Sequence, residues 1–147
     1  MTKLCISLFD YTGNQLKPWL DAGFMCLLVD IKHPPGLTAR EDGMWLLQAD
    51  LTKPFVLPPQ FHGREVAFVS AFPPCDHLAI SGARWFKGKG LRALARSVDM
   101  FATAAEFCES GGAPYFIENP VSTISTYWRD FDYKIHPHWF TGGGAQG

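Results

Sequence analysis

Cys75 follows two prolines at the end of an apolar run, and this position favours covalent chemistry. Residues 66–72 form the run and predict a buried strand, which Pro73 and Pro74 end because proline cannot continue a hydrogen-bonded ladder. The thiol is therefore expected at the carboxyl end of a strand, where α/β sheets bind their ligands. A rigidly held thiol at such a place is a candidate nucleophile, and a buried cysteine in a turn is the alternative.

Four acidic residues share this kind of position, just beyond the end of a predicted strand. They are Asp10, Asp30, Asp50 and Glu118. The strands are predicted from short apolar runs at residues 4–9, 24–29, 44–49, 66–71 and 115–117. The carboxyl ends of parallel strands meet at one edge of a sheet, so the four acids and the thiol would form one site. Taken singly, each acid is more often a loop residue or a helix cap.

Two helical patterns alternate with the strands. Residues 15–22 carry apolar side chains on one side, Pro18 is tolerated in the first turn, and Gly23 can end the helix. Residues 91–108 repeat apolar side chains at spacings of three and four, and two glycines then stop the pattern. Residues 33–43 predict a polar loop. This alternation predicts an α/β fold, with a mostly parallel sheet and helices on both faces.

The composition is that of one globular domain spanning residues 1–147, with 47% hydrophobic and 18% charged residues. The net charge of -1 excludes a globally basic nucleic-acid-binding protein, and no apolar stretch is long enough to span a bilayer. Wide cysteine spacing predicts a reducing, cytoplasmic setting, with Cys5, Cys26 and Cys108 in the core. No histidine spacing supports a metal site.

The first strand, loop and helix together resemble a nucleotide-binding turn. Gly13 would let backbone amides approach a ligand at the start of a helix. Asp30, after the second strand, is placed to take the hydroxyls of a ribose, and Asp50, after the third, could accept from an adenine amino group. The loop lacks the glycine pattern of dinucleotide sites, so an adenosine-containing ligand without a pyrophosphate fits better.

The order of these motifs resembles the cytosine-5 DNA methyltransferase family, and most closely its small phage-type members. Pro73-Pro74-Cys75 before a helix is similar to the family's nucleophile motif, and Glu118-Asn119-Pro120 after the next strand is similar to its Glu-Asn motif. Residues 9–13 and 22–24 resemble its first cofactor motif. The resemblance covers residues 4–120 and implies a Rossmann-like methyltransferase sheet.

The resemblance also implies a cofactor and a set of roles. The cofactor would be S-adenosyl-L-methionine. Its contacts would come from Phe9, Asp10, Thr12, Gly13, Asp30, Ile31, Asp50, Leu51 and Pro73. Cys75 would add to C6 of cytosine, Glu118 would engage the ring N3 and the exocyclic amine, and Asn119 would orient the loop. The target base must first be flipped out of the duplex.

Residues 82–96 form a local basic segment on this nearly neutral chain, with five cations, no acid and two interleaved aromatic residues. Cations can pair with phosphates, and aromatic rings can stack on a displaced base. The segment stands where the family has its mobile catalytic loop. The predicted nucleic-acid contacts are Ser81, Arg84, Trp85, Lys87, Lys89 and Arg92. The expected partner is DNA, RNA is the alternative, and an ordinary solvated helix start would also explain the charges.

The chain departs from the family in three places. Gln15 and Leu16 stand near the positions of further glycines, Asp76-His77 replaces the usual glutamine, and no Gln-x-Arg-x-Arg segment follows Tyr127. The resemblance therefore implies a catalytic domain that is incomplete at its C-terminal end, completed by self-association or by a complementing chain. The alternatives are an inactive relative that binds S-adenosylmethionine or nucleic acid, and an RNA cytosine-5 methyltransferase. The cytoplasm of a bacterium or of a phage-infected host cell is the expected location.

Overall fold

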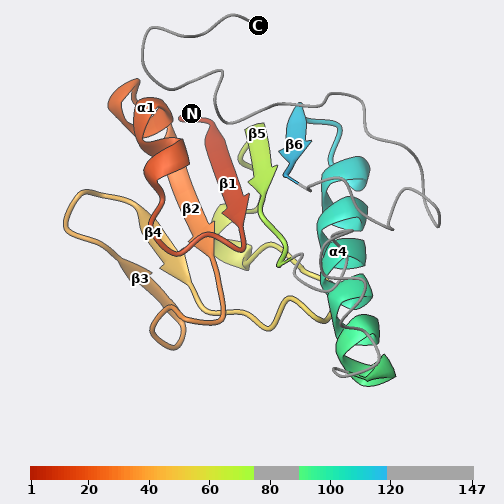
Figure 1. The fold of residues 1–147 in the computed structure, drawn as a ribbon. Helices are drawn as coiled ribbons and strands as arrows, with labels where there is room; N and C mark the ends of the chain where they lie inside the picture. The colour runs from red at the N-terminus through yellow and green to blue at the C-terminus, as the bar shows by residue number, and fades with distance from the viewer. Residues whose placement is uncertain (75–89, 119–147) are drawn as a thin grey trace, which may run out of the picture.

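The structure of the protein, a computed structural model, describes residues 1–74 and 90–118 (Figure 1). Several residues predicted to act in a site lie outside the described residues. They are Cys75, Ser81, Arg84, Trp85, Lys87, Lys89 and Asn119. The described residues include the predicted cofactor contacts, the acid Glu118 and the basic residue Arg92.

The described residues form an α/β fold around a six-stranded, mostly parallel mixed sheet with the strand order β3-β4-β2-β1-β5-β6. The strands are β1 Leu4–Leu8, β2 Met25–Val29, β3 Leu37–Ala39, β4 Trp45–Leu47, β5 Val66–Ala71 and β6 Tyr115–Ile117. Every pair is parallel except β3 with β4. From β1 the chain first builds β2 and β4 on one side and later β5 and β6 on the other. This order is compatible with a Rossmann-like sheet, and it places the switch in direction between β1 and β5.

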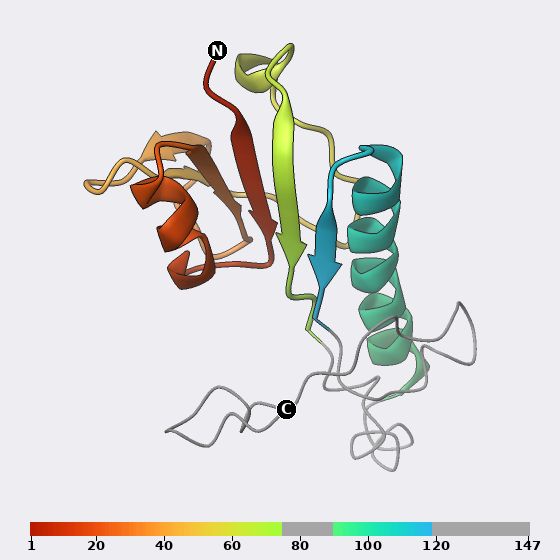
Figure 2. The same cartoon turned by 90° about the horizontal axis from the view of Figure 1, so that it is seen from above.

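Helices cover both faces of the sheet, as the sequence predicts. The 3-10 turn η1 (Asn14–Leu16) and the helix α1 (Lys17–Asp21) pack on one face, with Cys5 and Leu28 in the core beneath them. The helix α4 (Leu91–Ser110) packs on the other face, over Leu4 and Ile6. Figure 2 shows the strands between the orange α1 and the blue-green α4. Alternate residues of β1 thus point to two different cores.

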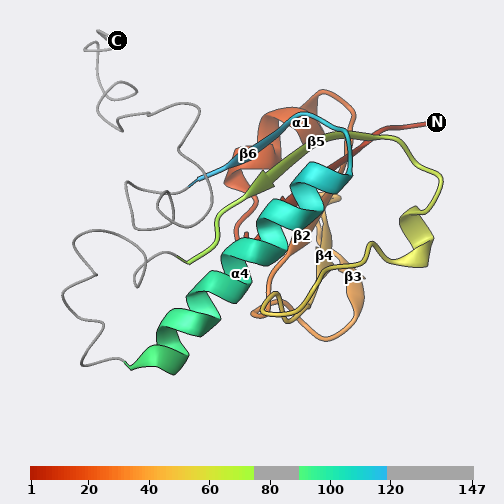
Figure 3. The same cartoon turned by 90° about the vertical axis from the view of Figure 1, so that its right-hand side faces the viewer.

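The two halves of α4 have different surroundings. The C-terminal half buries Phe101, Ala104 and Cys108 against the sheet, whereas Ser97 is the buried residue of the N-terminal half. Figure 3 shows that this N-terminal half projects beyond the strands. No helix among the described residues is long and apolar enough to cross a membrane.

The prediction of a polar loop at residues 33–43 is wrong in its middle part. Leu37–Ala39 form β3, which pairs antiparallel with β4 and makes a hairpin at the edge of the sheet. A strand of three residues is too short to show an alternating pattern, and its pairing comes from β4 rather than from its own sequence. The hairpin matters for the site because Arg40 lies in its turn.

The remaining connection, between β4 and β5, crosses the α4 side of the sheet without an α-helix. It contains the short 3-10 turn η2 (Pro59–Phe61), whose Phe61 is buried in the core beneath α4. Thr103 of α4 holds this connection at its start, because its hydroxyl lies 3.1 Å from the carbonyl oxygen of Lys53. The loop that follows β4 is therefore fixed to α4.

Candidate functional site

A cavity of about 690 Å³ lies at the carboxyl ends of β1, β2, β4 and β5, with α4 as an additional wall. Five of the nine predicted cofactor contacts line it. They are Phe9, Asp30, Ile31, Asp50 and Leu51. Tyr11, Phe72 and Pro74 add apolar surface, and Arg96 and Met100 contribute from α4. The fold thus brings together residues that are far apart in the sequence, at the carboxyl ends of the strands, where α/β sheets bind their ligands.

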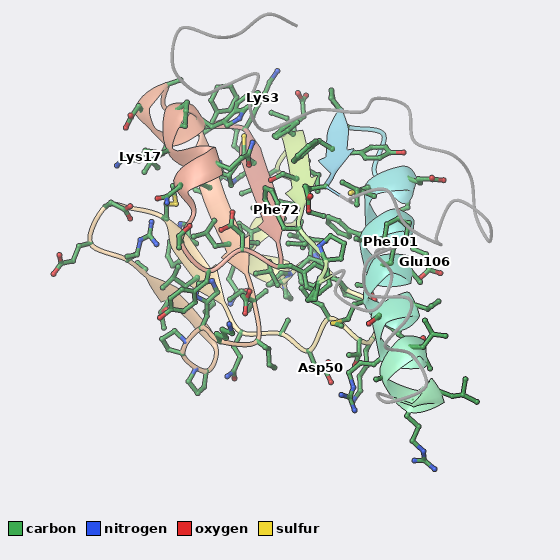
Figure 4. The ribbon with its side chains drawn as sticks, viewed as in Figure 1. Lys3, Lys17, Asp50, Phe72, Phe101 and Glu106 are labelled. Atoms are coloured by element: carbon green, nitrogen blue, oxygen red, sulfur yellow. The ribbon has the colours of Figure 1, made fainter. Side chains whose placement is uncertain are left out.

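A second hollow of about 650 Å³ lies at the other end of the sheet, beside the amino ends of the strands. None of the predicted site residues lines it. Its charged lining includes Lys3 and Glu65, which form an exposed ion pair at 2.9 Å. Figure 4 shows Lys3 and Asp50 at opposite ends of the sheet. An exposed pair of this kind contributes little to stability. The chemistry-bearing residues of the described segments are therefore gathered at the carboxyl edge.

Asp30 is held at the cavity by the turn that follows β2. Its backbone N–H donates to the carbonyl of Leu47 at 3.1 Å, and its Oδ1 accepts from the backbone N–H of Lys32 at 2.8 Å. These bonds fix the carboxylate without enclosing it, because the residue stays partly exposed. A carboxylate presented in this way can accept hydrogen bonds from two neighbouring hydroxyls.

Asp50 is also held by its own turn. Its Oδ1 accepts from the hydroxyl of Thr52 at 2.6 Å and from the backbone N–H of Thr52 at 3.0 Å. The hydrogen bonds from Thr52 lower the pKa of Asp50, with smaller contributions from the charges of Lys53 and Arg96. At neutral pH Asp50 is therefore an ionised acceptor at the wall of the cavity.

Asp10 and Gly13 shape the loop after β1 instead of lining the cavity. The buried carboxylate of Asp10 accepts from the hydroxyl of Ser7 at 2.7 Å and from the backbone N–H of Gly13 at 2.8 Å. Gly13 has φ +78°, and a Cβ there would lie 2.6 Å from Cδ1 of Leu28. The glycine therefore allows close packing against the core, whereas the sequence suggested close approach to a ligand.

Gln15, which follows this loop, joins it to the neighbouring strand. Its Oε1 lies 2.7 Å from the hydroxyl of Ser70 in β5, and that hydroxyl lies 3.0 Å from the hydroxyl of Ser7. Ser7 in turn donates to Asp10. A polar network thus crosses the switch point between β1 and β5 and holds the loop by side chains.

Two residues that the sequence analysis missed hold the other side of the loop. Nε2 of the buried His33 lies 3.0 Å from the carbonyl oxygen of Asp10, which requires the tautomer that carries a proton on Nε2. Nη1 of Arg40 donates to the carbonyl of Thr12 at 2.9 Å. Neither residue belongs to a local sequence motif, because each reaches the loop from a distant part of the chain.

Arg40 is itself fixed within the β3–β4 hairpin. Its guanidinium donates from Nε and Nη2 to the two carboxylate oxygens of Asp42, at 3.0 and 2.8 Å. This pairing lowers the pKa of Asp42 to about 2. A bidentate pair is geometrically specific, so it directs the remaining nitrogen, Nη1, toward the loop after β1. Thr12 therefore contributes its backbone to this support and does not line the cavity.

Glu118 lies at the end of β6, beside the strand that leads toward Cys75. Its backbone N–H donates to the carbonyl of Ala71, the last residue of β5, at 2.9 Å. Partial burial of its carboxyl raises the pKa of Glu118, although the residue as a whole is exposed. Beyond the end of β5, Pro73 is buried, whereas Pro74 is exposed and lines the cavity.

The three described cysteines have no role in the cavity. Cys5, Cys26 and Cys108 are buried, which confirms their prediction as core residues. Burial raises the pKa of the Cys5 thiol to about 11, and those of Cys26 and Cys108 to about 12. These thiols stay protonated at neutral pH and are poor nucleophiles.

Arg92 is the predicted nucleic-acid contact that the structure describes. It is exposed on the projecting half of α4, one turn before Arg96 of the cavity wall. Among residues 1–74 and 90–118, no group of three or more metal-binding side chains is placed to hold an ion. Comparison of the chain with known protein families, with curated proteins and with solved structures finds no match.

Proposed function

We propose that this protein is an S-adenosylmethionine-dependent methyltransferase that transfers a methyl group to C5 of cytosine in DNA. The observation that supports it best is the shared edge of the sheet. Asp30 and Asp50 line the cavity there, β5 leads from the same edge toward Cys75, and Glu118 follows β6. This arrangement supports the proposal that an adenosine-containing ligand binds beside a reacting base.

The residues present fit the cofactor. The apolar side chains of Phe9, Ile31 and Leu51 suit a flat adenine ring, Asp30 suits ribose hydroxyls, and the ionised Asp50 suits an amino group. When bound, S-adenosylmethionine would supply an electrophilic methyl group. The protein's part would be to hold the adenosine end through Asp30, Asp50 and the apolar side chains of the cavity. We therefore propose the Rossmann-like methyltransferase fold for this sheet.

Cys75 and Glu118 would activate the base together. The thiolate of Cys75 adds to C6, and Glu118 gives a proton to N3, so that C5 becomes electron-rich enough to take the methyl group. The C5 proton then passes to solvent water, the N3 proton returns to Glu118 and the thiolate departs from C6, which restores the aromatic ring. The raised pKa of Glu118 supports this role, because a carboxyl that stays protonated longer is a better donor.

DNA is the proposed partner of the basic segment. Arg92 is exposed on the projecting end of α4, where it can meet a phosphate. We propose that the remaining contacts come from Ser81, Arg84, Trp85, Lys87 and Lys89, and that Asn119 orients the loop after Glu118. A self-associated copy or a complementing chain would supply the recognition elements, and RNA is the alternative substrate.

A module that binds S-adenosylmethionine and nucleic acid without catalysing transfer is the second candidate. The cavity favours it because, among the described residues, those that suit adenosine do not include the proposed proton donor Glu118. Such a module would bind the cofactor and the oligonucleotide, yet would form no covalent bond to the base. The trapping experiment below distinguishes the two candidates.

The protein is expected to form a covalent adduct with an oligonucleotide that carries 5-fluorocytosine when S-adenosylmethionine is present. Fluorine at C5 cannot leave as a proton does, so the Cys75 bond to C6 persists and is visible by denaturing electrophoresis and mass spectrometry. The Cys75→Ser variant should give no adduct. Failure of the wild-type chain to form an adduct, while binding both ligands, would establish the binding module instead.

S-adenosylhomocysteine is expected to bind the cavity, and removal of the Asp30 charge should weaken it by about ten- to a hundredfold. A hydrogen bond to a charged group contributes about 1.5–3 kcal/mol, which corresponds to this range. Asp30→Asn is the sharper variant, because an amide oxygen can still accept from the N–H of Lys32 and keep the turn. Calorimetry measures the affinity. An affinity unaffected by Asp30→Asn would remove the ribose role.

A further inference from the structure

Tyr11 presents an exposed aromatic ring at the cavity, and a buried ring lies beneath it. Its ring is stacked on that of His33, with the centroids 5.3 Å apart and an angle of 14° between the planes. Tyr11 is 56% exposed and lines the cavity, whereas His33 is 3% exposed. One face of the Tyr11 ring is therefore covered by the protein, and the other face is available to a ligand.

The contacts around this stack fix it before any ligand binds. Nε2 of His33 lies 3.0 Å from the carbonyl oxygen of Asp10. The backbone N–H of His33 donates to the backbone carbonyl of Asp30 at 3.3 Å. On the two sides of Tyr11, the Asp10 carboxylate is anchored by Gly13 and the Thr12 carbonyl accepts from Arg40. A ring held in this way loses little conformational entropy on binding.

We propose that Tyr11, supported by His33, is a stacking platform for the adenine ring of the bound ligand. This inference rests on the proposed function and adds a residue to it, since the contacts that the family resemblance implies include Phe9 but not Tyr11. The turn that contains His33 also carries Asp30, so one short segment supports the base platform and offers the acceptor for the ribose. Aromatic rings stack on bases of every kind, and the neighbouring carboxylate selects a nucleoside.

The position of the platform favours the cofactor's base over the target base. Tyr11 and His33 follow β1 and β2, whereas Glu118 follows β6, which is separated from β1 by β5. Neighbouring strands lie about 4.8 Å apart, so about 10 Å separates β1 from β6. A cytosine engaged by Glu118 would therefore lie on the β6 side of the sheet, whereas the Tyr11 ring lies on the β1 side.

The test compares the affinities of adenosine and of S-adenosylhomocysteine for the wild-type protein and three variants, by calorimetry. Tyr11→Ala should weaken both ligands about tenfold, because the stacking surface is lost. Tyr11→Phe should stay within about twofold of wild type, because the ring remains. Val56→Ala is the matched control, since Val56 is 77% exposed and does not line the cavity. Unchanged thermal unfolding of Tyr11→Ala shows that the loss is one of binding.

The outcomes test the proposed function and the stacking role of Tyr11 separately. If the wild-type protein binds neither ligand, the proposed function fails. If it binds both and Tyr11→Ala binds them equally well, the function stands and the platform is wrong. If Tyr11→Ala keeps its affinity for adenosine but loses affinity for a single-stranded oligonucleotide, the ring serves nucleic acid and the inference is also wrong. A tenfold loss rescued by Tyr11→Phe supports it.

Discussion

Replacing Gly13 with alanine is expected to lower the free energy of unfolding by about 3 kcal/mol. The added Cβ would lie 2.6 Å from Cδ1 of Leu28 and 2.7 Å from Sδ of Met44, and both side chains are fully buried. Overpacking of a close-packed core costs about 1–3 kcal/mol. The left-handed backbone at φ +78° adds about 1–2 kcal/mol for any residue with a Cβ. The sum is a large part of the stability of a small domain.

Gly36→Ala is the matched control for this substitution. Gly36 has almost the same backbone angle, φ +80°, but a Cβ there would meet nothing within 4 Å. Urea unfolding of the two variants therefore separates the packing cost from the backbone cost, and Gly13→Ala should be less stable by about 1–3 kcal/mol. Equal losses in the two variants would mean that Leu28 and Met44 move aside without cost.

Replacing Glu118 with glutamine is expected to slow adduct formation with 5-fluorocytosine DNA by at least about a hundredfold. General acid catalysis contributes about 10²- to 10⁴-fold, and an amide cannot transfer a proton to N3. The affinity for S-adenosylhomocysteine should be unchanged, because Glu118 does not line the adenosine cavity. Single-turnover rates measured with saturating ligands test this. A rate within a factor of a few of wild type would exclude Glu118 as the proton donor.

The raised pKa of Glu118 also fixes the sign of two pH effects. Burial makes the ionised form unfavourable in the folded chain, so the stability associated with the protonated carboxyl is lost as pH rises through the raised value. Glu118→Gln should therefore be more stable than wild type at pH 7. This advantage should shrink as pH falls from the raised pKa toward the ordinary pKa of glutamate, about 4.3, and should be absent below it. Activity that depends on the protonated acid should fall over the same rise in pH. Glu106→Gln, an exposed substitution on α4, is the control.

Elements with strong local patterns were predictable from the sequence. The strands β5 and β6 and most of α4 have the predicted bounds, because each is a continuous apolar run or a clear repeat between breaking residues. The helix predicted at residues 15–22 is shorter and begins as the 3-10 turn η1. The strand β3 was missed because its three residues depend on the pairing edge of β4.

The location of the candidate site in the fold was predictable from the sequence, but many contacts of its side chains were not. The rule that ligands bind at carboxyl strand ends located Asp30 and Asp50, since it requires only the ends of two elements. The direction of a side chain within a loop depends on the path of the backbone, and Asp10 turns inward for that reason. The support from His33 and Arg40 could not be seen, because it joins segments that are distant in the sequence.

The central position of β1 has a consequence for how the domain folds. β1 pairs with β2, which follows it closely along the chain, and also with β5, which is distant in the sequence. In the second pairing Val66 lies opposite Leu4, so the pairing closes a large loop of chain. Contacts between distant residues close large loops and form slowly. The β1–β2 unit should therefore form early and the pairing of β1 with β5 late. The cavity needs walls from both sides of β1, so ligand binding should report the completion of folding and stabilise the whole sheet against unfolding.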